Sequence, residues 1–280
     1  MSIATTIYSI SNLLHVLSVN SDEFRELDSL LKQYYSNYTR DIVEFGSISL
    51  KWKKESLGNI DSYTFFSLSE LLLYRYYEIN KKSYQIAFDV GANTGIDSLI
   101  LGLNGYDVHS FEPDPKNIES FKRHIDENNL DNITTHQVAL TDKNEELEFV
   151  RVEGNITANH IVSARDSYGD TEKYKVQGMM FKDVGVIPDL MKINIEGSEK
   201  YLVPSIPEEV WGKCDTFIEI HSEKDRKIVY DFLKSINMNM FSNKIGWKKV
   251  SSVDDLPVTY KDGYMFVSKS NEMNWSTDIV

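Results

Sequence analysis

Residues 86–115 have the sequence IAFDVGANTGIDSLILGLNGYDVHSFEPDP, and this stretch decides the fold. It begins with a short, dense apolar run, which is typical of a parallel strand buried on both faces. A turn with two glycines follows at 91–95, then an apolar helical segment, and then a second apolar run that ends at Glu112. Strand, helix and strand in this order predict a βαβ unit of a parallel sheet.

The remainder of the chain continues this alternation. Asp114 and Pro115 suit the cap and the first turn of the next helix. Further strands are predicted at 132–140, 145–152, 188–197 and 214–222, followed by a helix at 224–236 and two strands at 247–253 and 263–269. We therefore predict an α/β fold with a doubly wound, mostly parallel sheet, closed by a strand pair whose last strand is antiparallel.

The first 82 residues have a different pattern. Residues 21–42 and 67–82 carry apolar side chains at helical spacing, and residues 42–54 alternate around a glycine like a short hairpin. This part has no catalytic signature of its own. We predict a helical and hairpin extension at 1–82, which is a cap or an oligomerisation element, and a second domain at 83–280. The tyrosines of the second helix fit either a homodimer or docking on the same chain.

Composition excludes several classes of function. The chain has 280 residues and a formal net charge of −13, which repels phosphate backbones, so we expect no nucleic-acid partner. Cys214 is the one cysteine, which excludes an intrachain disulfide and suits a cytoplasmic protein. No run approaches the roughly 20 apolar residues that span a bilayer, so we expect no membrane span.

The turn at 91–95 suits a ligand that approaches the backbone closely. Gly91 allows a tight turn, and Gly95 lets the helix pack against the strand. Glu112 lies 17 residues after Gly95, at the end of the second strand, where a carboxylate accepts hydrogen bonds from ribose hydroxyls. Dinucleotide-binding turns have a glycine at the place of Asn93, whose side chain would obstruct a pyrophosphate. This pattern favours S-adenosylmethionine, which has no phosphate.

Three motifs together resemble those of the FkbM-type methyltransferases: FDVGANTG at 88–95, FEPDP at 111–115 and KINIEGSE at 192–199. The resemblance covers about residues 84–270. It implies a class I methyltransferase (Rossmann-like) fold, S-adenosylmethionine as cofactor and methylation of hydroxyls on sugars or small metabolites. By position it implies that the cofactor is bound by Asp89, Gly91, Ala92, Asn93, Thr94, Gly95, Glu112, Val138 and Ala139.

The candidate catalytic residues follow the fourth and fifth strands of the predicted sheet. Lys192, Asn194 and Glu196 share one face by alternation, as do Glu219 and His221. Transfer of a methyl group to oxygen gains from a base that takes the hydroxyl proton. His221 is our first choice because histidine titrates near neutral pH, and Glu196 is the second. A hydrogen-bonded structural histidine and a helix cap are the competing interpretations.

Asn194 and Lys192 also bear on whether the site binds a metal and on how it binds the substrate. Asn194 stands where the family usually has aspartate, and an amide is the weaker metal ligand, so we predict no metal. We count Asn194 with the catalytic candidates and Lys192 with the residues that bind the substrate.

The polar segment at 154–174 is predicted to be a loop that covers the strand ends. Asn159 and His160 are our candidates for binding the acceptor, and Arg165 and Lys173 are candidates for meeting a phosphate or carboxylate on it. The competing interpretation for each is an ordinary surface-loop residue.

The leading hypothesis is an S-adenosylmethionine-dependent O-methyltransferase that acts on a sugar, a sugar nucleotide or a glycan intermediate. Two alternatives stay open. One is methylation of a small non-sugar metabolite or of a phosphate-type oxygen, and the other is a cofactor-binding scaffold with weak catalysis. Asn93 disfavours an oxidoreductase.

Overall fold

A central eight-stranded sheet organises the computed structural model, which describes residues 2–54, 56, 61–152, 159–162, 164 and 170–276. The strand order is β13-β12-β14-β11-β10-β3-β4-β5. The strands are β3 (Ile86–Val90), β4 (Asp107–Phe111), β5 (Ile133–His136), β10 (Leu190–Ile193), β11 (Asp215–Glu219), β12 (Asn239–Ser242), β13 (Lys248–Lys249) and β14 (Tyr264–Ser268).

The five strands from β11 to β5 are parallel, and β14 is antiparallel between β11 and β12. This confirms the predicted doubly wound sheet with an antiparallel last strand, which is the class I methyltransferase fold. The sequence prediction missed β12, because the run around residues 238–241 is short and alternates with asparagine.

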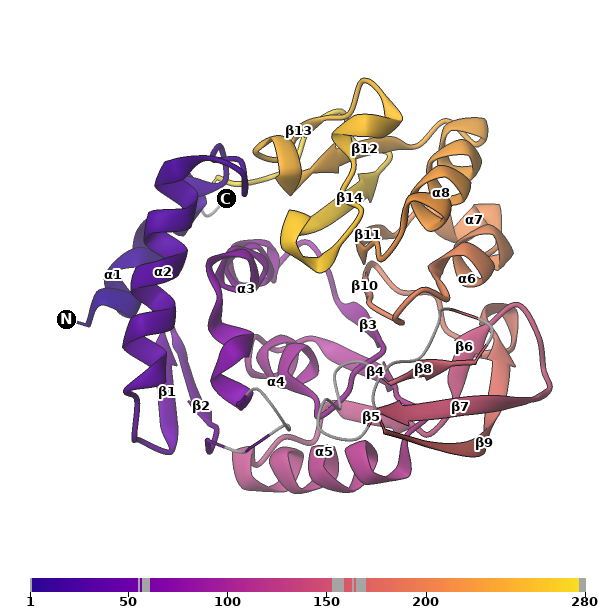
Figure 1. The fold of residues 1–280 in the computed structure, drawn as a ribbon, viewed down its shortest axis with the longest axis horizontal. Coiled ribbons are helices and arrows are strands. Elements are labelled where there is room, and N and C mark those ends of the chain that lie inside the picture. The colour runs from indigo at the N-terminus through magenta and orange to yellow at the C-terminus, as the bar shows by residue number, and fades with distance from the viewer. Residues whose placement is uncertain are drawn as a thin grey trace.

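Different helices cover the two faces of the sheet (Figure 1). Successive strand residues point to opposite faces. Leu190 and Phe217 accordingly belong to the core beneath α3, α4 and α5, whereas Met191 and Ile218 belong to the core beneath α6, α7 and α8. The helices are α3 (Leu68–Asn80), α4 (Ile96–Leu103), α5 (Pro115–Asn128), α6 (Glu199–Ser205), α7 (Glu208–Trp211) and α8 (Glu223–Ser235).

Cys214 precedes β11 and is buried in the second of these cores, 1% exposed. Burial raises the pKa of its thiol well above the usual range. No helix in the described part of the chain combines the length and apolar character needed to cross a bilayer.

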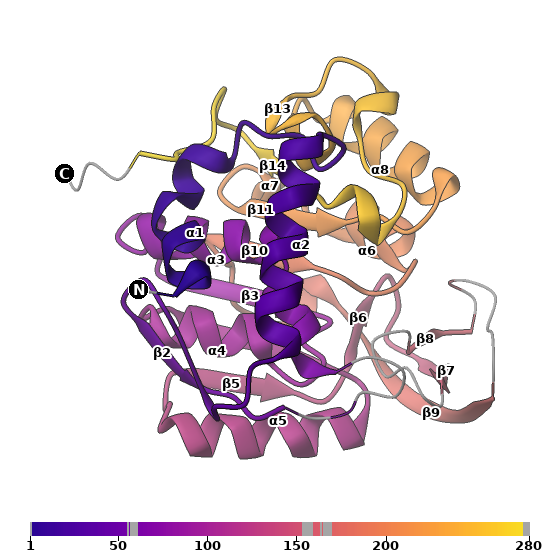
Figure 2. The same cartoon turned by 60° about the vertical axis from the view of Figure 1, so that its left-hand side comes forward.

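The N-terminal segment packs around α3. Both α1 and α2 contact α3, and Figure 2 shows α2 lying along the outside of the molecule. The helix predicted over 21–42 is present but ends at Ser36, the hairpin predicted over 42–54 is present, and α1 was not predicted. The elements are α1 (Ile3–Leu14), α2 (Asp22–Ser36), β1 (Ile42–Phe45), β2 (Ile48–Lys51) and a 3-10 turn, η1 (Ser62–Phe66).

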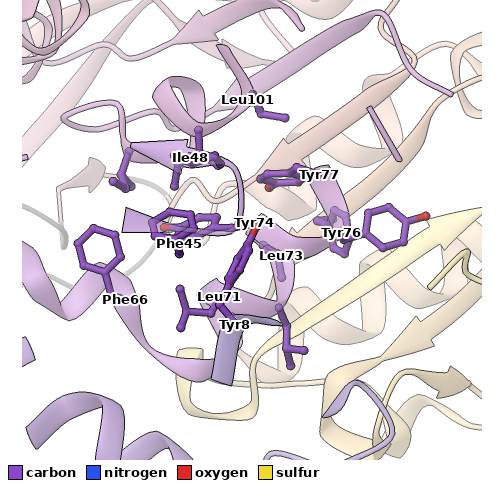
Figure 3. Close-up of a cluster of buried hydrophobic side chains, with 14 of the residues drawn as sticks. Tyr8, Phe45, Ile48, Phe66, Leu71, Leu73, Tyr74, Tyr76, Tyr77 and Leu101 are labelled. Carbon is purple, nitrogen blue, oxygen red and sulfur yellow. The ribbon is translucent and has the colours of Figure 1, made fainter. Parts of the chain in front are cut away.

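Aromatic side chains join this segment to the sheet. Figure 3 shows Tyr8, Phe45 and Tyr74 close together, and the ring centroids of Phe45 and Tyr74 are 5.9 Å apart. Tyr76 places its ring 5.2 Å from that of Phe217 on β11. The sequence predicted one apolar face for α3, but the structure buries it on several sides, as expected of a helix inside a core.

A second, four-stranded sheet lies beside the first, in the order β6-β9-β7-β8. The single strand predicted at 132–140 divides here, because β5 ends at His136 and the next strand belongs to the other sheet. Residues 171–174, which were predicted as loop, begin a long strand. The four strands are β6 (Ala139–Thr141), β7 (Glu146–Val152), β8 (His160–Ile161) and β9 (Thr171–Met180).

Candidate active site

A cavity of about 1040 Å³ opens at the carboxyl ends of β3, β4, β10 and β11. Its size suits a ligand as large as a nucleoside derivative together with a second molecule. Most predicted site residues lie in its wall. These are Gly91, Ala92, Asn93, Thr94, Glu112, Val138, Ala139, Asn159, His160, Lys192, Asn194, Glu196 and His221.

The two glycines of the turn have different tasks. Gly91 has φ +84°, and a Cβ atom there would lie 1.8 Å from the backbone oxygen of Asn194, so only glycine fits. Gly95 has φ +96°, and a Cβ atom there would lie 2.0 Å from the ring of Phe121 on α5. Gly95 therefore allows contact with a neighbouring helix, where the sequence predicted packing of a helix on a strand.

Asp89 is fully buried behind the turn and is not part of the cavity wall. Its Oδ2 accepts hydrogen bonds from the backbone N and the Oγ of Ser98, at 3.1 and 2.6 Å. Ser98 lies in the first turn of α4, where N–H groups lack partners within the helix. Asp89 thus holds the start of α4, and it also lies 3.8 Å from the ammonium of Lys192, which lines the cavity.

Glu112 is held by donors on both sides of its carboxylate. It is 5% exposed and accepts hydrogen bonds from the N–H groups of Asn93 and Asp114, both at 2.9 Å, and from Asn117 Nδ2 at 3.2 Å. Burial raises the pKa of Glu112 to about 7, and these hydrogen bonds oppose the rise. A carboxylate has about four acceptor positions, and the described residues occupy three of them here.

The loop after β10 has an unusual backbone. Glu196 and Gly197 are both left-handed, with φ +55° and +98°. Such a backbone at a residue with a side chain persists only where its surroundings enforce it, and it is common at functional sites. Here the buried Glu199 accepts the N–H groups of Ile195 and Gly197, both at 2.9 Å. Burial raises the pKa of Glu199 to about 8.

The structure brings the three predicted catalytic residues together. His221 Nε2 lies 2.9 Å from Asn194 Oδ1, and His221 Nδ1 lies 3.8 Å from Glu196 Oε2. When Nε2–H donates to Asn194, Nδ1 carries the lone pair and is the basic atom of the ring. The histidine side chain is only 8% exposed. The arrangement can accept a proton from a group bound in the cavity.

Lys192 lies among carboxylates. Its Nζ is 3.3 Å from Asp97 Oδ2 and 3.8 Å from Asp89 Oδ1. Burial lowers the pKa of Lys192, but Asp97, Asp89, Glu70 and Glu219 together raise it above the usual range. Sequence reasoning missed Glu70 and Asp97 as site residues. Each is an isolated acid without an acidic neighbour in the sequence, and such an acid gives no signal in one sequence.

Asn159 and His160 line the cavity, and both are buried, so they are not the ordinary surface-loop residues of the competing interpretation. Asn159 is 9% exposed, accepts a hydrogen bond from the backbone N of Val152 at 3.0 Å and donates one to Asp114 Oδ2 at 3.0 Å. His160 is 1% exposed and lies in β8. Asn159 therefore connects β7 to the cap of α5, since Asp114 also accepts the N–H of Lys116.

Of the other two loop candidates, Lys173 is the one within the described residues, and it is not part of the cavity wall. Lys173 lies in β9, exposed, with its Nζ 4.0 Å from Glu148 Oε2. Arg165 falls outside the described residues. Within the described ranges, no group of three or more histidine, cysteine, aspartate or glutamate side chains is arranged to hold a metal ion.

Comparison with known proteins gives one partial match in sequence. A family model described as tellurite resistance protein TehB matches residues 78–153, which include the glycine turn and Glu112. No curated protein matches the chain.

Solved structures give a weak likeness. A precorrin-6y C5,15-methyltransferase of Geobacter metallireducens is 11% identical, with a TM-score of 0.41 over 69% of this chain and 85% of that one. An rRNA methylase of Streptococcus thermophilus is 9% identical, with a TM-score of 0.37 over 69% and 93%. TehB of Haemophilus influenzae is 18% identical, with a TM-score of 0.28 over 53% and 41%.

Proposed function

We propose that this chain is an S-adenosylmethionine-dependent methyltransferase. One observation carries the proposal: residues 91–94 of the turn, Glu112 and residues 138–139 line one cavity at the carboxyl ends of the strands. Open α/β sheets bind their ligands at this edge. Asn93 occupies the place where a pyrophosphate requires glycine, and the family model matches this same part of the chain.

Different residues of the cavity wall suit the adenine and the ribose of this cofactor. Val138 and Ala139 offer apolar surface for the adenine, and the remaining acceptor position of Glu112 suits a ribose hydroxyl. Gly91 lies in the same wall, where its missing side chain makes room for the carbonyl of Asn194. When bound, the cofactor supplies an electrophilic methyl group on a sulfonium.

We propose His221 as the base and oxygen as the methylated atom. The hydroxyl oxygen of the acceptor forms a bond to the methyl carbon, the C–S bond breaks with its electron pair going to sulfur, and His221 Nδ1 takes the hydroxyl proton. Asn194 orients the ring through the 2.9 Å contact with Nε2. Glu196, 3.8 Å from Nδ1, stabilises the ring once it is charged.

For the acceptor we propose a sugar or another small hydroxyl compound, in keeping with the FkbM-type motifs. The cavity wall has more carboxylates than cations, which disfavours acceptors that carry phosphate. The carboxylates are Asp28, Glu70, Asp97, Glu112, Glu196, Glu219 and Asp262, and the cations are Arg25, Lys32, Lys192 and Lys261.

Calorimetric titration tests the cofactor. S-adenosylhomocysteine should bind and NADH should not, and the opposite result would end the proposal. Methyl transfer from labelled S-adenosylmethionine to neutral sugars, sugar nucleotides and small alcohols then tests the reaction. Transfer to the neutral acceptors is the expected outcome. A scaffold would bind the cofactor and turn over none of the acceptors.

A further inference from the structure

Helix α3 of the N-terminal segment places a carboxylate in the cavity wall. Glu70 lies in the first turn of α3, and Tyr264 on β14 donates a hydrogen bond to its Oε1 at 2.8 Å. Seven residues further along α3, Tyr77 donates a hydrogen bond to Asp97 Oδ1 at 3.2 Å. Because α3 also packs through Tyr76 on β11, the core determines where Glu70 lies.

The charges in this part of the wall do not balance. Three carboxylates of the wall, Glu70, Asp97 and Glu219, act together with the buried Asp89 on the single ammonium of Lys192. Asp97 and Glu219 are 4% and 6% exposed, so water screens them little. Burial raises the pKa of Glu219 to about 7 and that of Glu70 well above its usual range. A ligand cation at this place would stabilise the ionised carboxylates.

Lys192 has capacity for a ligand as well. It is 6% exposed and lies in the wall, yet its two ion pairs, at 3.3 and 3.8 Å, are longer than a usual N–H···O hydrogen bond. A buried ammonium with three donors normally has shorter partners. The cluster therefore offers carboxylates for a cation and a buried ammonium for an anion, which together complement an amino-acid zwitterion.

The position of the cluster agrees with such a ligand. Along the sheet, β5, β4, β3, β10 and β11 are consecutive. Val138 follows β5 and Glu112 follows β4, whereas Lys192 lies in β10 and Glu219 ends β11. Two strand spacings separate β4 from β10, which is roughly 10 Å. With adenine at Val138 and ribose at Glu112, the amino-acid end of the cofactor would extend past the glycine turn toward Lys192 and Glu219.

We propose that Glu70, Asp97, Glu219 and Lys192 bind the amino-acid end of S-adenosylmethionine, with Glu70 contacting its ammonium group. The N-terminal segment then completes the cofactor site and is more than a cap or an oligomerisation element. This inference rests on the proposed function and adds to it a residue outside every motif of the sequence.

Two ligands separate this role from a structural one. S-adenosylhomocysteine has the amino-acid end, and 5′-methylthioadenosine has the same adenosine without it. In calorimetric titrations, Glu70→Gln should weaken S-adenosylhomocysteine roughly tenfold and leave 5′-methylthioadenosine within about twofold. Asp97→Asn should shift the ratio of the two affinities in the same direction, which provides a second test if Glu70→Gln does not fold.

A matched control lies on the same helix. Glu78 is a carboxylate of α3 that bonds to Ser47 and Tyr8 and lies outside the cavity wall, so Glu78→Gln should leave the ratio unchanged. An equal loss of both ligands in Glu70→Gln, or no loss of either, would overturn the inference. A wild-type protein that binds neither ligand would instead overturn the proposed function, and the inference with it.

Discussion

The two sides of the cavity are built differently. On the β3–β4 side, main-chain groups hold the site: Glu112 receives the N–H groups of Asn93 and Asp114, and Gly91 provides the turn. On the β10–β11 side, side chains hold one another, as His221 does with Asn194. A site held by main-chain groups can be recognised in the sequence, because it requires glycines and helix-cap residues at fixed places. A site held by pairs of side chains uses residues that are far apart in the sequence, so their pairing is known only from the structure.

The two sides also touch. The carbonyl of Asn194 fills the space that a side chain on Gly91 would need. This close approach is between backbone and backbone. Substitutions can test this difference between the two sides, first at the place where the sides meet and then on each side separately.

Gly91→Ala should have the largest effect, because it combines a left-handed backbone with a clash against main-chain atoms. We expect the free energy of unfolding in urea to fall by about 3 kcal/mol or more, with loss of S-adenosylhomocysteine binding. Gly105→Ala is the matched control: its φ is +90° but no atom lies within 4 Å of the added Cβ, so it should lose only about 1 kcal/mol. Equal losses would show that the contact with Asn194 relaxes easily.

His221→Ala should affect the β10–β11 side alone. We expect kcat for methyl transfer to fall on the order of 100-fold, with S-adenosylhomocysteine affinity unchanged within about twofold, because a base acts on the acceptor proton. Glu196→Gln should cause a smaller fall. His15→Ala, a histidine stacked on Trp275 away from the cavity, serves as control. Full turnover in both His221→Ala and Glu196→Gln would show that the base is assigned wrongly.

Glu112→Gln should affect the β3–β4 side alone. Since both S-adenosylhomocysteine and 5′-methylthioadenosine carry the ribose, we expect each to bind roughly tenfold more weakly. This parallel loss differs from the selective loss expected for Glu70→Gln. A variant that loses S-adenosylhomocysteine but keeps 5′-methylthioadenosine would place Glu112 elsewhere along the cofactor.

The pH dependence of stability should show the smallest effect. Burial raises the pKa of Glu112 from 4.5 to about 7, so the folded protein holds a proton that the unfolded chain has released. Stability of the ligand-free protein should therefore fall as pH rises from 6 to 8, and Glu112→Gln should reduce this fall by roughly 1 kcal/mol. Urea titrations at both pH values measure it. Identical falls in the two proteins would mean that Glu112 is already ionised at pH 6.

The fold was largely predictable because its central strands are dense apolar runs separated by glycines and caps. Asp114 accepts the N–H of Lys116 at the start of α5, as the Asp-Pro pair indicated. The divided strand was not predictable, because no glycine or proline interrupts residues 132–140 and only the tertiary structure sends Ala139 to another sheet. The strand β9 was mistaken for loop at its polar beginning, where Glu172 and Lys173 are exposed.

The candidate site was also predictable only in part. Period-2 alternation predicted that Asn194, Glu196 and His221 lie at one edge of the sheet. In the structure, His221 is within 4 Å of both other side chains. Their roles stay predictions. Glu199 was part of a quoted motif, but its bonds to Ile195 and Gly197 depend on a loop shape that no spacing encodes. Asn159 was predicted to bind the acceptor from a loop, and its bonds to Val152 and Asp114 could not be read from the sequence.

The buried Cys214 gives the protein a built-in reporter. A thiol reagent reacts with the thiolate, and here the thiol is both protonated and enclosed by the core next to β11. The rate at which a small reagent modifies the intact protein therefore measures how often that core opens. Because the chain has one cysteine, a single mass increment reads out this motion without any engineered label. A ligand that ties the two loops together would slow the labelling.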